Sequence, residues 1–367
     1  MSLTNFIDPE SVVTQFDISG RFRGIEPVHM GHIHDSFISN WSDDTEEKRY
    51  LHQRMNHTVF PDLEGLMNNI LLVTEHLASH PIEGEETLSL IASKRGGVMV
   101  QDRNDDFWRT FKYVENAEVI NRCPSPIHAH EAGRIFGSFI QRLTDLDPAK
   151  LNITIPNFFH LPTRVKELKM AAEKNLIPPR SSQAATELES ILEREETYAV
   201  ITHSLDQGRL PYRVIHYDPK INNVLFDAHT GKAMCVVDLD TCMPGTLLYD
   251  FGDMVRTSSV ETAEDEEELS KIEINLDFFK NILEGYVGAV RGLLTQSEIA
   301  LMPFAPAAAT LTVGMRFLSD YLSGDVYFKT SHAEHNLQRA RAQLALVRSM
   351  EEHKREIENL VLNVMQQ

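Results

Sequence analysis

Cysteine is scarce in this chain, which has only Cys123, Cys235 and Cys242 among its 367 residues. An odd number without a C-x-x-C pair argues against both a disulfide framework and a cysteine-ligated zinc site. Few disulfides are typical of proteins from reducing compartments. We therefore expect a cytoplasmic protein.

An excess of basic residues is also missing. The chain has 35 Lys and Arg against 54 Asp and Glu, a formal net charge of -19. Such a field opposes binding to nucleic acid or to an anionic membrane surface, so we expect neither as a partner. The same field would favour a cationic ligand, although many soluble enzymes are equally acidic.

No apolar run is long enough for a membrane span. The most apolar stretch, Ile299 to Met315, is interrupted by two prolines and is shorter than the roughly 20 apolar residues that a bilayer requires. The first residues, MSLTNFIDPESVV, lack the basic and apolar regions of a signal peptide. We expect the apolar stretch to be a buried helical segment.

The composition that remains, 42% hydrophobic and 24% charged, is that of an ordinary globular protein, and the length suits two domains. Residues 15–77 predict strands around 36–38 and 49–52, followed by a helix after Pro61-Asp62. The runs 88–91 and 107–114 can complete a small sheet. These features predict a mixed first domain over residues 1–120.

Breaker residues over 121–127 mark the expected start of a second domain, residues 121–367. Helical periodicity dominates there, with apolar faces over 132–143 and 357–364. Its exception is a predicted hairpin, with strands at 224–226 and 234–237 around a turn at 227–231. The fold class predicted is α+β, with a β-rich smaller domain and a mostly helical larger one.

The hairpin region carries the most informative motif. His216, Asp218 and Asn223 have the spacing H-x-D-x-x-x-x-N of phosphotransferase catalytic loops, and Asp238-Leu239-Asp240 follows. Phosphoryl transfer needs a carboxylate that accepts the proton of the acceptor hydroxyl, and oxygen ligands for Mg²⁺. Asp218 is the candidate base. Asn223, Asp238 and Asp240 are the candidate metal ligands.

Two local details support this interpretation. Lys220 lies where a cation can neutralise charge on the transferred group, and Asp238 and Asp240, two apart on a predicted strand, would point to one face. The competing interpretation is structural, since Asp and Asn favour turns and Asp238 can cap a strand end. The combination of motif, hairpin and D-x-D favours catalysis.

On these motifs the chain resembles the aminoglycoside phosphotransferase and choline kinase superfamily, and within it the N-acetylhexosamine 1-kinase group. The resemblance extends through much of the chain, in the strings GHIHDSF at 31–37, QRMN at 53–56, WRTF at 108–111, IPNFFH at 155–160, YDFGD at 249–253 and RFLSDYL at 316–322.

The resemblance implies a bilobal, protein-kinase-like fold that uses ATP and Mg²⁺. Residues 113–117 then correspond to a hinge whose backbone would bind adenine, with Tyr113, Glu115 and Ala117 as the contacts. His216 and Asp250 would support the catalytic loop. Near the sugar it places His32, Arg316 and Asp320.

The chain also departs from the protein-kinase pattern. It lacks a G-x-G-x-x-G loop, because Gly20, Gly24 and Gly31 are spaced differently, and no V-A-I-K lysine follows. Arg54 is the candidate replacement cation for the phosphates, with Glu64 as its partner, against the alternative of a solvent-facing Arg54. The H-x-H pairs at 32/34 and 128/130 lack a third ligand, and we expect no metal there.

The function expected is therefore an ATP- and Mg²⁺-dependent kinase that phosphorylates the C1 hydroxyl of N-acetylglucosamine or N-acetylgalactosamine. One alternative keeps the chemistry but changes the acceptor to an aminoglycoside, choline or another small alcohol. Another is a catalytically silent nucleotide-binding module, against which the complete set of Asp218, Asn223 and Asp238 argues. The sequence leaves the oligomeric state open.

Overall fold

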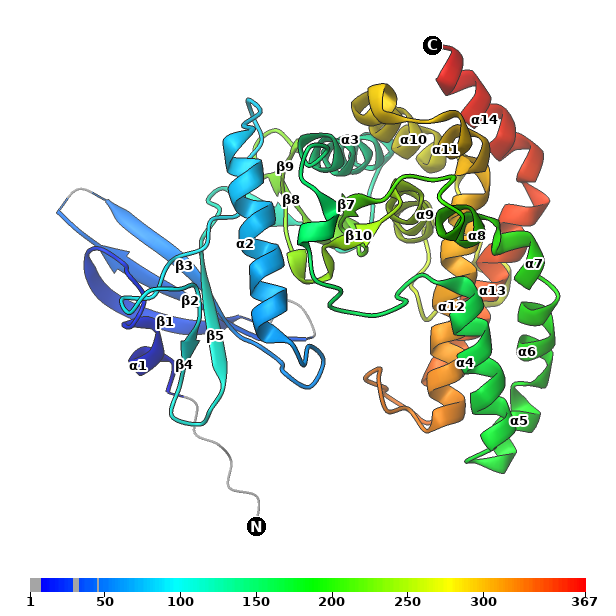
Figure 1. Cartoon of the computed structure of the whole chain (residues 1–367), viewed down its shortest axis with the longest axis horizontal. Coiled ribbons are helices and arrows are strands. Elements are labelled where there is room, and N and C mark those ends of the chain that lie inside the picture. The colour runs from blue at the N-terminus through cyan, green and yellow to red at the C-terminus, as the bar shows by residue number, and fades with distance from the viewer. Residues whose placement is uncertain (1–7, 29–32, 45) are drawn as a thin grey trace. The chain divides into compact units, whose positions relative to one another are not determined.

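The computed structural model describes residues 8–28, 33–44 and 46–367. The chain forms two compact units. The first comprises residues 1–117 together with 151–154, and the second comprises 118–150 and 155–367. Each unit has its own sheet or sheets (Figure 1). Each also has its own buried residues.

The first unit is built on a five-stranded antiparallel sheet with the order β1-β2-β3-β5-β4. The strands are β1 (Arg21–Val28), β2 (Asp35–Ser42), β3 (Glu47–Arg54), β4 (Val100–Gln101) and β5 (Phe107–Lys112). Residues 36–38 and 49–52 lie in β2 and β3, as predicted. The run 88–91 forms no named strand, although Leu90 bridges to Phe111 of β5 and the backbone nitrogen of Ile91 donates to Thr110.

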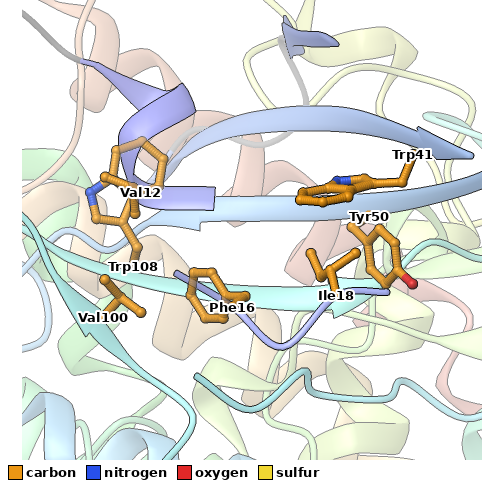
Figure 2. Packing of buried hydrophobic residues seen from close by; sticks show 7 residues of the cluster. All are labelled: Val12, Phe16, Ile18, Trp41, Tyr50, Val100 and Trp108. Carbon is orange, nitrogen blue, oxygen red and sulfur yellow. The ribbon is translucent and has the colours of Figure 1, made fainter. Parts of the chain in front are cut away.

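One face of this sheet packs on an apolar cluster that includes the short helix α1 (Pro9–Val13). Strand alternation points Trp41, Tyr50 and Trp108 to the same side, where Phe16 and Ile18 fill the space between them (Figure 2). Trp108 and Phe16 are fully buried. The cluster fixes the register of the central strands, because a slip by one residue would expose these rings.

Helix α2 (Leu63–Ser79) completes the unit. It begins where Pro61-Asp62 predicted a helix start, since the side chain of Asp62 accepts a hydrogen bond from the backbone nitrogen of Gly65 at 2.8 Å. Its apolar positions, Leu66, Ile70 and Val73, are fully buried. The guanidinium of Arg109 on β5 contacts Met67 of α2.

The second unit is mostly helical, as the sequence predicted. A three-stranded sheet of order β6-β8-β9 and the pair β7-β10 interrupt the helices. The strands are β6 (Ala117–Val119), β7 (Arg213–Ile215), β8 (Val224–Asp227), β9 (Ala233–Val236) and β10 (Met243–Gly245). Strands β8 and β9 form the predicted hairpin.

Helices make up most of this unit. They are α3 (Pro126–Arg142), α4 (Leu161–Lys174), α5 (Pro178–Gln183), α6 (Ala185–Leu192), α7 (Glu195–Tyr198), α8 (Val200–Asp206), α9 (Leu247–Ser258), α10 (Leu276–Val290), α11 (Gln296–Leu301), α12 (Ala305–Ser323), α13 (His335–Glu352) and α14 (Lys354–Gln366). Helix α12 packs against α4, α9 and α13.

The apolar stretch at 299–315 spans the end of α11, a 3₁₀ turn at Met302–Phe304 and most of α12. Within the described residues, the helical stretch Gln296–Ser323 meets the length and hydropathy of a membrane span, but 72% of its most apolar window is buried inside the fold. It is the buried helical segment that the sequence predicted.

Candidate active site

The H-x-D-x-x-x-x-N motif forms the loop that joins β7 to β8. Strand β7 ends at Ile215, the loop turns through Tyr217 and Asp218, and a single 3₁₀ turn, Ile221–Asn223, leads into β8. Tyr217 has φ +66°, a left-handed conformation that is costly for a residue other than glycine. Strain of this kind persists only where neighbouring groups hold the backbone in place.

The side chain of Asp250, on α9, holds the backbone of this loop in place. Its carboxylate accepts hydrogen bonds from the backbone nitrogens of His216 at 2.8 Å and Tyr217 at 2.7 Å. Thr246 caps the start of α9 and so fixes the helix turn that carries Asp250. Burial raises the pKa of Asp250 to about 7, although the two N–H donors favour the carboxylate. Asp250 therefore supports the backbone of the loop.

The ring of His216 anchors the loop to Val237, the residue that follows β9. Its Nε2 donates to the carbonyl of Val237 at 2.9 Å, and its Nδ1 accepts from the backbone nitrogen of Asp218 at 3.2 Å. This pairing requires the neutral ring with its proton on Nε2. Burial lowers the pKa of His216 in agreement with that state. The ring of His216 therefore holds the backbone at Asp218.

Both carboxylate oxygens of Asp218 have a partner from the same loop. Oδ1 lies 2.8 Å from Nζ of Lys220, and Oδ2 accepts from the side-chain amide of Asn223 at 3.1 Å. Burial disfavours the charge on Asp218, but the charge and the hydrogen bond of Lys220 outweigh it and lower the pKa of Asp218. Asp218 is therefore an ionised carboxylate with a fixed orientation.

Asn223 is oriented by the same contacts. Its Nδ2 donates to both the backbone carbonyl and the carboxylate of Asp218, which leaves its amide oxygen as the atom that can serve as a ligand. The carbonyl of Asn223 also accepts from the backbone nitrogen of Val237 at 2.9 Å. Val237, which precedes Asp238, is thus hydrogen-bonded directly to Asn223.

The D-x-D does not lie on a strand, which corrects the prediction. Strand β9 ends at Val236, Asp238 has φ +61°, and Leu239–Thr241 forms a 3₁₀ turn. Asp238 is exposed, whereas Asp240 is 2% exposed, so the two carboxylates differ in environment instead of sharing one face. An amide oxygen and an exposed carboxylate on adjoining segments suit a hard cation such as Mg²⁺. Asp238 fits this role better than the buried Asp240.

Arg316 of α12 lies in an aromatic cluster. Its guanidinium is 4.3 Å from the ring centre of Phe158, 5.6 Å from that of Tyr327 and 5.5 Å from that of Phe328. In the described part of the chain no carboxylate forms an ion pair with it. Burial lowers the pKa of Arg316 and Arg164 adds to this effect, while Asp218 acts in the opposite direction. The charges of Arg316 and Asp218 are therefore close enough to affect each other.

Asp320, predicted near the sugar, has a different place. Its two oxygens accept four hydrogen bonds of 2.9 Å, from the backbone nitrogens of residues 326–328 and from the side-chain amide of Asn336. With both oxygens occupied, Asp320 is better suited to anchoring the segment that carries Tyr327 and Phe328 than to binding a sugar. A contact between Asp320 and a sugar stays a prediction.

The predicted pair of Arg54 and Glu64 does not form. Arg54 binds Asp35 and Asp106 instead, because Asp35 lies directly opposite Arg54 in the register of β2 and β3. Glu64 is exposed in the first turn of α2. A buried cation on the opposite face of the sheet is Arg109 of β5, whose Nε donates to Gln53 at 2.9 Å. The string WRTF contained Arg109, but nothing in the sequence singled it out.

The predicted hinge follows β5. Arg49 stacks 4.2 Å above the ring of Tyr113 and pairs with Glu115, so both side chains are engaged with β3. Ala117 begins β6. Any adenine contact from Tyr113, Glu115 or Ala117 would therefore come from the backbone, as the resemblance implies. His32 lies outside the described residues.

Sequence reasoning missed a buried charge network beside the loop. Asp253 and Arg256 of α9 form an ion pair at 2.6 Å, and Arg256 also binds Glu264 at 2.7 Å. Glu264 belongs to an acidic run at residues 261–268. The spacing of Asp250, Asp253 and Arg256 along α9 was the available signal.

The sequence matches the Phosphotransferase enzyme family over residues 38–276. Among solved structures, the fold is similar to that of an aminoglycoside phosphotransferase from Alicyclobacillus acidocaldarius, with a TM-score of 0.61, 11% identity and coverage of 96% of this chain and 98% of that one.

A choline kinase from Cryptosporidium parvum is similar with a TM-score of 0.57, 12% identity and coverage of 94% and 92%. A spectinomycin phosphotransferase, solved with ADP and spectinomycin, has a TM-score of 0.53, 10% identity and coverage of 99% and 100%. At these identities the likeness shows a shared kinase-like fold. Because the family match covers more than half of its length, the chain belongs to the phosphotransferase enzyme family.

Proposed function

We propose that this protein is an ATP- and Mg²⁺-dependent kinase that phosphorylates the C1 hydroxyl of an N-acetylated hexosamine. The observation that carries the proposal is the catalytic loop, in which Asp218 is held as an ionised carboxylate between Lys220 and Asn223. The family match supports phosphoryl transfer. The choice of acceptor rests on the resemblance of the six strings and on the environment of Arg316.

The contacts of Asp218 support the proposal that it is the base. The side-chain amide of Asn223 donates to one carboxylate oxygen of Asp218, and Asp250 fixes the backbone of the two preceding residues. The carboxylate of Asp218 therefore loses little conformational freedom when an acceptor hydroxyl binds. The carboxylate orients that hydroxyl and accepts its proton as the oxygen attacks the γ-phosphorus. The ammonium group of Lys220 offsets the charge on the transferred phosphoryl group.

Asn223 and Asp238 are the residues that would hold the metal ion, with Asp240 as a buried support. Bound Mg²⁺ would screen the charge of the nucleotide phosphates. The protein's own contribution is the orientation of the ligands, because Asp218 fixes the amide of Asn223 and the bond from Val237 to Asn223 holds the start of the D-x-D segment.

The surroundings of Arg316 favour a neutral acceptor over a cationic one. A guanidinium that has no ion-pair partner in the described part of the chain would oppose a cationic group placed directly against it, such as the ammonium of choline. The rings of Phe158 and Tyr327 offer flat apolar surfaces, and the guanidinium offers hydrogen-bond donors for hydroxyl or carbonyl oxygens. A sugar with an N-acetyl group presents both kinds of surface.

The experiment is an acceptor screen coupled to ADP release. We expect turnover with N-acetylglucosamine or N-acetylgalactosamine, less with unsubstituted hexoses and none with choline or kanamycin. Phosphorus NMR of the product should show an anomeric phosphate. ADP release with a cationic acceptor but not with N-acetylated sugars would overturn the choice of acceptor.

The same screen distinguishes two alternative functions. The net charge of -19 favours a cationic acceptor, such as an aminoglycoside or choline. Thermal stabilisation by ATP without turnover on any acceptor would instead indicate a silent nucleotide-binding module. Saturating ligand at 100 times Kd would stabilise the fold by about 2.7 kcal/mol, which a melting experiment detects.

A further inference from the structure

The side chain of Tyr217, the residue directly before Asp218, is enclosed as closely as its backbone is held. Its hydroxyl donates to the carbonyl of Pro244 on β10 at 3.1 Å. A Cβ atom at Gly245, also on β10, would lie 2.6 Å from that hydroxyl oxygen, so a larger residue there would displace the phenol. The left-handed backbone of Tyr217 therefore coincides with a side chain that β10 leaves room to accept.

Three aromatic rings complete this enclosure. The ring centre of Tyr217 lies 5.7 Å from that of Phe158, 6.1 Å from that of Phe159 and 6.0 Å from that of Tyr249. Aromatic pairs attract each other at such separations, and the interplanar angle of 83° with Phe158 is the edge-to-face arrangement. Phe159 and Tyr249 are buried, whereas Phe158 is half-buried. Phe158 is therefore the outer member of the enclosure.

Phe158 also supports the guanidinium of Arg316, which lies 4.3 Å from its ring centre. Within the described residues, the hydrogen bond of this guanidinium is a long one, from Nη2 to the hydroxyl of Tyr327 at 3.5 Å. Ring contacts therefore fix its place more than hydrogen bonds do. A single ring thus contacts both a residue of the candidate catalytic loop and a cation assigned to the acceptor.

The backbone at Phe158 is fixed by Arg164 of α4. Nη2 of Arg164 donates to the carbonyl of Pro156 at 3.3 Å, and its Nε donates to the carbonyl of Phe158 at 3.4 Å. Its Nη1 pairs with Glu167 at 2.7 Å. Asn157, with φ +55°, makes the turn between the two carbonyls, a conformation that asparagine adopts more readily than most residues. The ring of Phe158 therefore projects from a turn that is held in place.

We propose that Phe158 is a positioning residue that keeps Arg316 in register with the loop at Asp218. Its ring supports the guanidinium and packs against Tyr217, so the group that binds the acceptor and the base that takes its proton share one rigid support. The inference rests on the proposed function, because Arg316 and Asp218 have these tasks only if an acceptor is phosphorylated there.

The test is a pair of double-mutant cycles. Phe158→Leu removes the ring and should raise KM for the acceptor and lower kcat, each by about fivefold, while KM for ATP stays within about twofold. In the Arg316→Met background the effect on KM should fall below about twofold, and in the Tyr217→Leu background the effect on kcat should do the same. Equal effects in all backgrounds would overturn the proposal, since Phe158 would then act by itself.

Further variants separate positioning from a loss of folding. Phe158→Tyr restores an aromatic ring and should recover most of the loss in KM. Arg164→Lys keeps the charge but not the fork that reaches two carbonyls, so it should show the same pattern with a smaller loss. The matched control is Phe304→Leu in the same unit, which removes a ring under Lys354 and should leave KM for the acceptor unchanged. Wild-type kinetics in Arg164→Lys together with no recovery in Phe158→Tyr would contradict the proposal.

The outcomes separate this inference from the proposed acceptor. Coupling measured with choline, kanamycin or an unsubstituted hexose, without turnover on N-acetylated sugars, would reject the acceptor and support the role of Phe158. Turnover on N-acetylated sugars without coupling would reject the role of Phe158 alone. Absence of turnover on every acceptor would overturn both.

Discussion

At the scale of single residues, the structure gives Asp218 and Asp250 different surroundings, which fits the proposal that Asp218 is the base. Asp250 is fully buried and bonded to two backbone nitrogens, whereas Asp218 is partly exposed, keeps its charge through Lys220 and shares its other oxygen with Asn223. The two carboxylates therefore differ in the kind of donor that they accept from: backbone N–H groups for Asp250 and the side chains of Lys220 and Asn223 for Asp218.

Replacing Asp218 tests whether its carboxylate is the base. Asp218→Asn should lower kcat by about 10²- to 10⁴-fold, because a positioned general base contributes that much to proton transfer. Steady-state ADP release with the best acceptor measures the loss. The control is Asp227→Asn in the turn of the hairpin, whose carboxylate bonds only to its own turn. A variant at Asp218 with near-normal turnover would exclude the role of base.

At the scale of elements, a few polar side chains fix the segments that carry the site. Thr246 and Asp62 cap α9 and α2, and Asp320 gathers three backbone nitrogens of the segment after α12. Such contacts are local, so their removal should affect one segment without unfolding the chain.

The segment anchored by Asp320 provides a direct test. Asp320→Ala should raise KM for the acceptor by about tenfold while KM for ATP stays within about twofold, because the rings around Arg316 lose their support and a charge-assisted hydrogen bond contributes ~1.5–3 kcal/mol. Limited proteolysis should cut the variant faster within residues 324–330. If proteolysis becomes faster but KM for the acceptor does not change, the segment that Asp320 anchors does not contribute to acceptor binding.

The cap of α2 is a second element-scale test. Asp62→Ala should destabilise the protein by about 1 kcal/mol, since the nitrogen of Gly65 loses its acceptor. Asp62→Ser retains a capping oxygen and should lose much less. Urea unfolding monitored by circular dichroism gives both values. Equal losses in the two variants would show that capping is not the source of the effect.

At the scale of the whole molecule, stability depends on pH through groups that do not belong to the candidate catalytic loop. His52 is fully buried in the sheet of the first unit, with Nε2 2.6 Å from Ser39 and Nδ1 2.7 Å from Thr110. Burial lowers the pKa of His52 to about 3. The neutral ring is therefore part of the folded state across the physiological range.

This pKa predicts the acid limb of the stability curve. In the unfolded chain His52 would bind a proton below about pH 6.5, whereas the folded protein resists protonation until about pH 3, so the unfolded state holds more protons between these values. The stabilising effect is complete above pH 6.5 and declines as the pH falls, by at most about 1.4 kcal/mol per pH unit.

Chemical denaturation between pH 4 and 7 measures this effect. His52→Gln should be less stable at pH 7 and should lose less stability on acidification than the wild type. The exposed His229 provides the control, since His229→Gln should leave the slope unchanged. An unaltered slope in His52→Gln would assign the acid sensitivity to other groups.

Local sequence patterns were sufficient to predict several elements of the fold. The start of α2 at Pro61-Asp62, the hairpin of β8 and β9 and the apolar helix faces of the second unit all depend on neighbours within a few residues. The spacing of His216, Asp218 and Asn223 is likewise local, because one loop carries all three. Physical rules of periodicity, capping and turn formation act over the same range.

By itself the sequence determined that His216, Asp218 and Asn223 share one loop, and its motifs predicted the kinase-like fold. Only the tertiary structure decided which distant groups meet: Arg54 pairs with Asp35 instead of Glu64, Asp320 anchors a segment, and Asp253 and Glu264 surround Arg256. The physical reason is that the partner of a charged side chain depends on strand register, helix facing and burial. These are set by the packing of the whole chain and not by spacing along it.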